Sequence, residues 1–268
     1  MLIKVRFPHL LALAYLLLPA GCVSQGSQGT AVSGAAAGRT SEGADAGLER
    51  CAETLGTLAV DDGRESAWFS EFGRRTKVTT IEPMIRLAVQ QSNCFIITSI
   101  GNLRTDSRLS RITDKQRNSG EYRAGSNQQK GQRVAADYFL EPSIIIDESS
   151  LGGVGGVVGG LLGPGAGAIA GGLEGKSSVV TLVLFDIRSS VQISASEGSA
   201  TSTNFGAALG AFGGGGGAAF GGLSRTPEGK ATVAAFVDAY NGLVRALRNY
   251  EAQDVEGGLG RGGKLKVN

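Results

Sequence analysis

The sequence predicts a single α/β sandwich domain of about 200 residues that closes with a β-hairpin and a helix. Three patterns carry this prediction. Apolar residues recur at helical spacing from Ile81 to Ser92. They alternate with a period of two between Val180 and Ala195, where 188–190 form the turn of a hairpin. Helical spacing then returns in the segment 226–250.

Residues 1–21 have the pattern of a signal peptide. Lys4 and Arg6 precede the apolar residues 10–18. A stretch of about nine apolar residues is too short to cross a hydrocarbon core of ~30 Å as a helix. We therefore exclude this segment from the fold.

The end of this segment resembles a bacterial lipobox. Ala20, Gly21 and Cys22 give the small-small-cysteine ending, although Pro19 stands where leucine is usual. The resemblance implies that Cys22 is acylated and becomes the N-terminus. Val23 in place of aspartate implies the outer membrane, and several acyl chains give stable anchoring. The alternative is an ordinary signal peptide with an unmodified Cys22.

The remaining cysteines, Cys51 and Cys94, form an even pair in a compartment that permits disulfides. Cys51 precedes the apolar run 54–60, and Cys94 opens the apolar run 94–100. If these two strands are parallel neighbours, both cysteines lie at the same end of the sheet. We expect a disulfide, and the alternative is two buried free thiols.

Composition excludes most enzyme chemistry. The single histidine, His9, lies in the signal peptide, so the mature chain lacks the commonest general base and metal ligand. Scattered carboxylates, among them Asp137, Glu141 and Asp147, are the remaining candidates for acid–base work. A formal net charge of +2 gives no indication of a nucleic-acid partner. We expect no enzyme, no cofactor and no metal.

The chain divides into a flexible Gly- and Ser-rich tether (22–50), the domain (51–250) and a Gly-rich, disordered tail (251–268). Within the domain we expect, in order, a strand at 54–60, a helix at 81–92 capped by Thr79 or Thr80, a strand at 94–100, a helix at 128–138, a strand at 139–147, the hairpin and the closing helix. We expect Asp137 to be a helix-end residue.

Residues 103–129 are polar and rich in charge. Arg104, Arg108, Arg111 and Arg117 could form a basic patch. Acidic residues alternate with them, which favours a solvated helix and loop instead.

Four segments in order resemble the CsgG/HfaB family of outer-membrane lipoproteins, which serve curli secretion and holdfast anchoring. The segments are "TTIEPMIRLAVQQSNCFIIT", "RVAADYFLEPSII", "VVTLVLFDIRSSVQISASEGSAT" and "VAAFVDAYNGLVRAL". The resemblance covers about 54–247. It implies a periplasmic α/β domain, ring-shaped oligomers and, in channel members, two membrane hairpins per subunit in a shared barrel.

Two uncharged glycine-rich runs, 151–173 and 205–223, fall where channel members carry those hairpins. They lack the alternation of membrane β-strands. Glycines instead recur every fourth residue, as in the G-x-x-x-G helix-association pattern. The residues for which we expect membrane or subunit contact are Gly155, Gly159, Gly163, Gly167, Gly171, Gly206, Gly210, Gly214, Gly217 and Gly221.

Three structures remain open for these runs. They could form glycine-zipper helices or helical hairpins, flexible apolar loops, or barrel hairpins of the curli type. Pro164 favours a kink or a helical hairpin over one straight helix in the first run.

From the sequence we expect an outer-membrane lipoprotein for export or assembly of surface material, such as curli-like fibres or an adhesin anchor. Its partners would be the membrane, through acylated Cys22, other copies of the chain and a secreted amyloid-like or adhesin cargo. The alternative is a non-pore envelope scaffold that contacts peptidoglycan or a partner machine.

Overall fold

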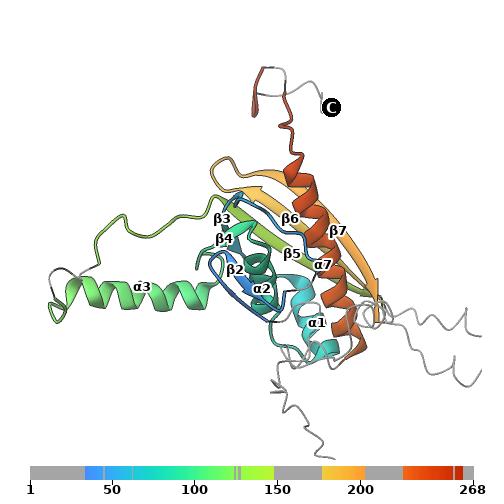
Figure 1. Ribbon diagram of the computed structural model, residues 1–268, viewed down its shortest axis with the longest axis horizontal. Helices are drawn as coiled ribbons and strands as arrows, with labels where there is room; N and C mark the ends of the chain where they lie inside the picture. The colour runs from blue at the N-terminus through green and yellow to red at the C-terminus, as the bar shows by residue number, and fades with distance from the viewer. Residues whose placement is uncertain are drawn as a thin grey trace, which may run out of the picture.

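A five-stranded sheet covered on one face by helices forms the body of the protein (Figure 1). The computed structural model describes residues 34–44, 46–61, 63–123, 125, 128–147, 177–202, 226–255 and 257–261. Within these residues the chain is a mixed α/β protein with four helices. None of these helices is long and apolar enough to span a membrane.

The sheet has the strand order β4-β3-β5-β6-β7. Its strands are β3 (Gly56–Val60), β4 (Phe95–Ile97), β5 (Tyr138–Asp147), β6 (Ser177–Asp186) and β7 (Val191–Thr201). The pairs β4–β3 and β3–β5 are parallel, and β5–β6–β7 form an antiparallel meander. The two short strands are parallel neighbours, with Gly56 opposite Phe95, which meets the condition on which the expected disulfide depended.

Side-chain alternation divides the sheet into a buried and an open face. On β6, Val180, Leu182 and Leu184 are fully buried, while the residues between them are half-buried. The predicted period of two is therefore correct on β6. On β7 it breaks at a bulge opposite Leu184 and Phe185, and Ile193 packs against the core.

Three helices pack on the buried face: α1 (Ala67–Thr76), α2 (Glu82–Ser92) and α7 (Pro227–Arg248). The predicted apolar faces of α2 and α7 are confirmed in the core. The buried residues on these faces are Ile81, Met84, Ile85, Ala88, Val89, Val233, Phe236, Tyr240, Leu243 and Val244. Neither Thr79 nor Thr80 is the N-cap of α2: Ile81 occupies that position, and Thr80 Oγ1 accepts from the Glu82 N–H at 3.2 Å.

Helix α3 (Leu103–Asn118) projects from the body and buries no residue (Figure 1). Its start is fixed by the Asn102 side chain, which accepts from the Thr105 N–H at 2.8 Å. Just before it, Gly101 has φ +93°, and a Cβ there would lie 2.5 Å from the Val60 carbonyl oxygen. This tight turn ends β4 at Ile97, earlier than the predicted 94–100.

Two further predictions are wrong. Residues 128–137 contain no helix, because the Asp137 N–H bonds the Thr57 carbonyl at 3.0 Å and directs the chain into β5. Asp137 is therefore not a helix-end residue. Within the segment predicted as a tether, β1 (Ala35–Ala37) and β2 (Thr40–Glu42) form an antiparallel hairpin. Of the tail, residues 251–255 and 257–261 contain no helix or strand.

Close packing of α7 on β7 requires a glycine in the strand. A Cβ at Gly198 would lie 2.3 Å from both the Ala235 carbonyl oxygen and the Ala239 nitrogen. We expect Gly198→Val to lower the free energy of unfolding by about 2 kcal/mol or more, since backbone must move. Ser199→Val, on the open face, should change it by less than about 0.5 kcal/mol. Urea denaturation of the two variants measures this, and equal midpoints would contradict it.

Candidate functional site

The described residues that flank both glycine-rich insertions lie at one end of the sheet. Strand β5 ends at Asp147, which pairs with Ser177 at the start of β6, and Ser177 pairs with Thr201 at the end of β7. The chain therefore leaves β5, enters β6 and leaves β7 at the same end of the sheet. We call this the insertion end.

Helix α7 begins at the insertion end as well. Its N-cap, Thr226, accepts from the Gly229 N–H at 3.1 Å. One turn later, Thr232 Oγ1 lies 3.0 Å from the buried Ser178 hydroxyl of β6. In Figure 1, β7 ends and α7 starts together at the lower right. The described residues on either side of both insertions thus lie within one small region of the domain.

The residues of the insertions themselves, including all ten glycines named above, lie outside the described residues. Cys22 lies outside them too. The structure therefore defines the points from which these segments leave.

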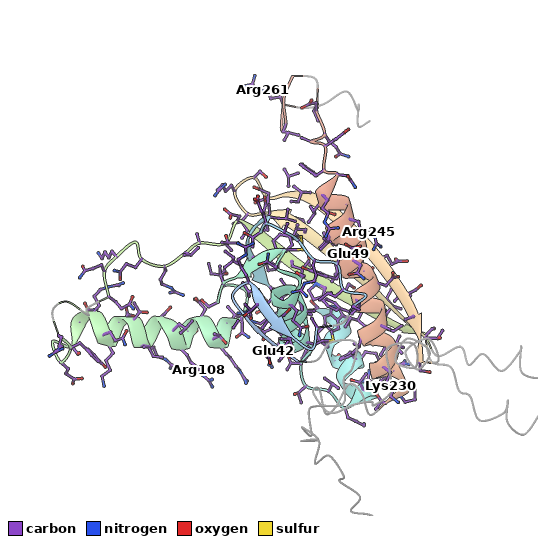
Figure 2. The ribbon with its side chains drawn as sticks, in the orientation of Figure 1. Glu42, Glu49, Arg108, Lys230, Arg245 and Arg261 are labelled. Carbon is purple, nitrogen blue, oxygen red and sulfur yellow. A yellow bond between two sulfur atoms is a disulfide. The ribbon has the colours of Figure 1, made fainter. Side chains whose placement is uncertain are left out.

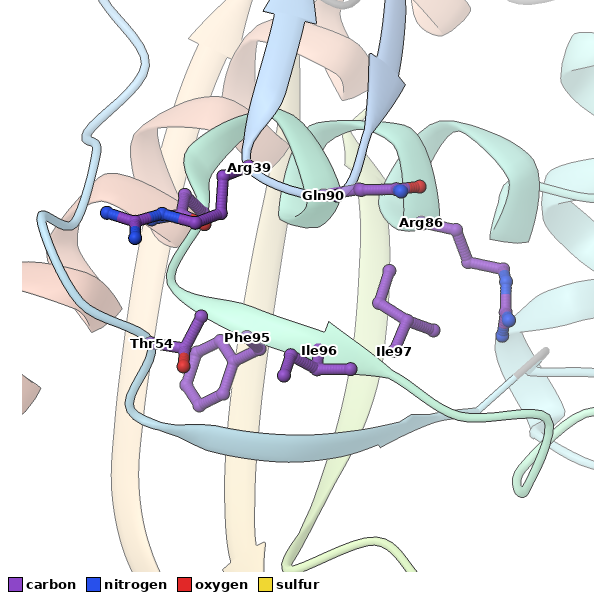
Figure 3. A pocket seen from close by; sticks show the side chains of 9 residues that line it. Arg39, Thr54, Arg86, Gln90, Phe95, Ile96 and Ile97 are labelled. Carbon is purple, nitrogen blue, oxygen red and sulfur yellow. The ribbon is translucent and has the colours of Figure 1, made fainter. Parts of the chain in front are cut away.

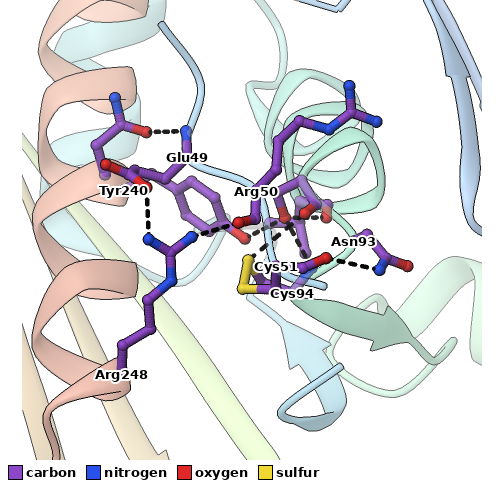
Figure 4. The surroundings of a disulfide bond; sticks show 10 residues. Glu49, Arg50, Cys51, Asn93, Cys94, Tyr240 and Arg248 are labelled. Atoms are coloured by element: carbon purple, nitrogen blue, oxygen red, sulfur yellow. Dashed lines mark hydrogen bonds and ion pairs between the residues drawn. A yellow bond between two sulfur atoms is a disulfide. The ribbon is translucent and has the colours of Figure 1, made fainter. Parts of the chain in front are cut away.

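A second cluster, the tether junction, joins the segment 47–51 to the domain. Cys51 and Cys94 form a disulfide with a Cα–Cα distance of 4.9 Å (Figure 4). Beside it, the Asn93 amide donates to the Cys51 carbonyl at 2.9 Å. The Cys51 N–H donates to the Ser92 carbonyl at 2.9 Å. The tether is thereby fixed to the end of α2 and the start of β4.

Helix α7 holds the other side of the tether junction. Asn241 accepts from the Glu49 N–H at 2.8 Å and donates to the Gly47 carbonyl at 2.7 Å. The Glu49 carboxylate lies 3.3 Å from Arg245 and 2.7 Å from Arg248 (Figure 2). Hydrogen bonding to Arg248, with a smaller contribution from Arg245, holds the pKa of Glu49 below its ordinary value.

A buried hydrogen bond links these two sides. The Tyr240 hydroxyl lies 2.7 Å from Ser92 Oγ, and both residues are fully buried. Ser92 Oγ also lies 2.6 Å from the Val89 carbonyl and accepts from the Cys94 N–H at 3.0 Å. Since the serine proton is directed to Val89, Tyr240 donates to Ser92. Burial raises the pKa of Tyr240, so it remains neutral.

The carboxylates considered for acid–base chemistry are not brought together. Asp137 Oδ2 lies 2.8 Å from the Thr57 hydroxyl and 3.1 Å from its N–H, and Oδ1 lies 2.6 Å from Arg188. The Thr57 hydrogen bonds, aided by Arg188, hold the pKa of Asp137 below its ordinary value. Glu141 is four residues along an extended strand, about 13 Å away. Asp137 serves to join β3 to β5.

A groove of about 430 Å³ runs along the free edge of β4, between α2 and the tip of the β1–β2 hairpin (Figure 3). Its arginines, Arg39 and Arg86, diverge at opposite ends. Arg39 donates to the Ala52 carbonyl at 3.2 Å, and Arg86 donates to the Thr98 carbonyl at 3.0 Å. Ile96, 56% exposed, occupies the floor. Arg86 also forms an ion pair with the Glu82 carboxylate at 3.4 Å.

In the part of the chain that the structure describes, no group of three or more His, Cys, Asp or Glu residues could hold a metal ion. Neither the Tyr240–Ser92 hydrogen bond nor the Glu49 ion pairs were predicted from the sequence. The helical spacing of Asn241, Arg245 and Arg248 on α7 marks the face that meets the tether, but nothing in the sequence identifies its partner.

No family model matches the chain, and no curated protein matches it either.

The disulfide should be a major source of stability. Closing a loop with a sequence separation of 43 is worth about 4 kcal/mol in the chain-entropy account. We expect Cys51→Ala/Cys94→Ala to lose roughly that amount in a urea titration. Reductant should destabilise the wild type and leave the variant unchanged. If reductant has no effect on the wild type, the prediction is wrong.

The Glu49 ion pairs should make the junction sensitive to acid. Because the pKa of Glu49 is lowered in the folded state, its stabilising effect is complete above the ordinary value of 4.5. It is lost as the pH falls through the lowered pKa. The wild type should therefore be more stable than Glu49→Gln at pH 7, and the gap should close below the lowered pKa. A gap independent of pH in thermal melts would contradict this.

Proposed function

We propose that this protein is an outer-membrane lipoprotein of the CsgG type that exports or assembles surface material. It acts as an oligomer, anchored by acylated Cys22, and performs no chemistry of its own. Its two glycine-rich insertions make the membrane or subunit contacts. The observation that carries the proposal is the convergence of both insertions on one end of the sheet.

Convergence matters because each run is long, apolar and uncharged. Two such runs at opposite ends of a domain could not enter one membrane together. At the insertion end they leave from β5 and β7, which lie on either side of β6 and are therefore about 10 Å apart. A single apolar patch from each subunit, next to those of its neighbours, is what a shared membrane assembly requires.

The tether junction supports the same proposal. A lipidated chain needs a firm connection where its flexible segment meets the domain. Here the disulfide and the Asn241 and Glu49 contacts with α7 fix that point. A covalent crosslink of this kind suits an oxidising compartment such as the periplasm.

The alternative function is a non-pore scaffold, tethered by Cys22 and bound to peptidoglycan or a partner machine. The absence of polar, lumen-facing residues from the two runs favours it. The open groove beside β4 is a surface at which such a partner could dock.

Channel and scaffold differ in one experiment. The lipidated chain is extracted in detergent and compared with a variant in which 152–172 is replaced by a polar Gly-Ser linker of equal length, so that β5 and β6 still connect. We expect negative-stain images of rings with a stained central hole for the wild type, and conductance in planar bilayers. The variant should lose both.

A control replaces the tail, 251–268, with a Gly-Ser linker of the tail's own length and should retain rings and conductance. Monomers or small oligomers from the wild type and the variant alike would rule out the channel. The tethered scaffold would then be the better account.

A further inference from the structure

Helix α3 is exposed to an unusual degree for a helix of 16 residues. It buries no side chain and packs on no strand of the domain. Leu109 and Ile112, three residues apart, are 42% and 53% exposed. Isolated helices of this length are only marginally stable in water, so α3 needs a partner surface.

The contacts that α3 does make lie on one side. The segment returning to β5 supplies Arg133, which lies 2.5 Å from Asp106 and 3.0 Å from the Ser110 hydroxyl. Arg117 on the same side donates to the Gln128 carbonyl at 3.2 Å. The opposite side of the helix is left to solvent.

That opposite side carries a basic stripe, formed by Arg104, Arg108 and Arg111 at helical spacing. None of the three has an ion-pair partner among the residues the structure describes. Figure 2 shows Arg108 on the lower side of α3, while the returning segment runs above it. Leu109 and Ile112 flank the stripe on the neighbouring face.

The open face of the sheet carries apolar residues and acidic groups, which complement the apolar and basic residues of α3. Its members are Phe139, Glu141 and Ile145 on β5, Val179, Val183 and Phe185 on β6, and Ala195 and Glu197 on β7. Within the described residues no helix covers it, and Ile145 is 61% exposed. Glu141 and Glu197 have no ion-pair partner there.

The acidic groups on the sheet and the arginines on α3 also have similar spacings. Glu141 and Glu197 stand two strands apart and are offset by two residues, which separates their backbones by about 12 Å. Arg104 and Arg111 are seven helical residues apart, about 10.5 Å. One helix laid across the face can therefore meet both acidic groups while its apolar residues cover the middle.

We propose that α3 of one subunit packs across the open sheet face of a second copy, pairing its basic stripe with Glu141 and Glu197. The helix cannot reach its own sheet face, because it starts beyond the β4 edge and projects away from the body (Figure 1). In this contact the sheet has helices on both of its faces, so the domain gains a third layer.

This contact joins two different surfaces, so every subunit keeps one of each free for a neighbour. Such head-to-tail contacts close into rings or continue as filaments. The proposal depends on the described domain alone and not on the export role.

A charge exchange tests it in the full lipidated chain in detergent. Arg104→Glu/Arg108→Glu/Arg111→Glu and, separately, Glu141→Lys/Glu197→Lys should each weaken association by roughly tenfold or more in light scattering. Combining all five changes in one chain should restore assembly. Lys130→Glu/Arg261→Glu, a change of exposed charges elsewhere, should leave it intact.

Hydrogen exchange provides a readout specific to α3. Its amides should be protected in the wild-type oligomer and exchange rapidly in either charge variant. A wild type that remains monomeric, a five-fold variant that fails to reassemble, or unprotected α3 amides would each overturn the proposal. So would an α3 variant that loses only its binding to vesicles containing anionic lipid, since the stripe would then face a membrane. Oligomers that form but do not conduct ions would support this interface and contradict the proposed channel.

Discussion

The hydrogen bond between Tyr240 and Ser92 is the constraint around which the domain is organised. It lies in the core where α7, the end of α2 and the start of β4 meet, and Ser92 Oγ also accepts from the Cys94 N–H. Removing the phenol hydroxyl would take away one of the hydrogen bonds of Ser92 Oγ, while its bonds to Val89 and Cys94 remain, a loss of about 0.5–1.5 kcal/mol for a typical hydrogen bond. The disulfide and the tether are placed by the same residues, so folding of the core and fixing of the tether are one event.

The helical layer is complete on only one side of the sheet. Ser178 and Thr232 join β6 to α7 at the insertion end, and Gly198 permits the close approach of α7 along β7. The opposite face has apolar residues that alternate with polar and acidic ones and no helical cover among the described residues. A domain with this asymmetry presents three separate features to its surroundings: an insertion end, an open face and a projecting basic helix.

Much of the fold could be predicted from the sequence, because apolar residues that recur at a regular period form the buried face of a helix or strand. The apolar faces of α2 and α7 and the β6–β7 hairpin follow from this periodicity, whereas the parallel pairing beside the cysteines was only a condition on which the expected disulfide depended. Helix α1 was not predicted, since only Trp68, Phe72 and Thr76 face inward and Gly73 interrupts the pattern. The segment 128–137 has helical composition. It is not helical, because Arg133 and Asp137 form hydrogen bonds with residues that are distant in the chain. Contacts of that kind leave no local trace, and for the same reason the Glu49 and Tyr240 interactions of the candidate site could not be foreseen.

The position of the tether junction limits how the proposed anchor and insertions can share a membrane. Glu49 is held near the last turns of α7, whereas the insertions leave beside its first turn. A helix of 22 residues is about 33 Å long, so the junction lies that far from the insertion end. Between Cys22 and Gly34 the chain can span at most about 40 Å. That reach is comparable with the length of α7, so acyl chains on Cys22 can enter the same leaflet as the insertions only if the chain extends back along the domain.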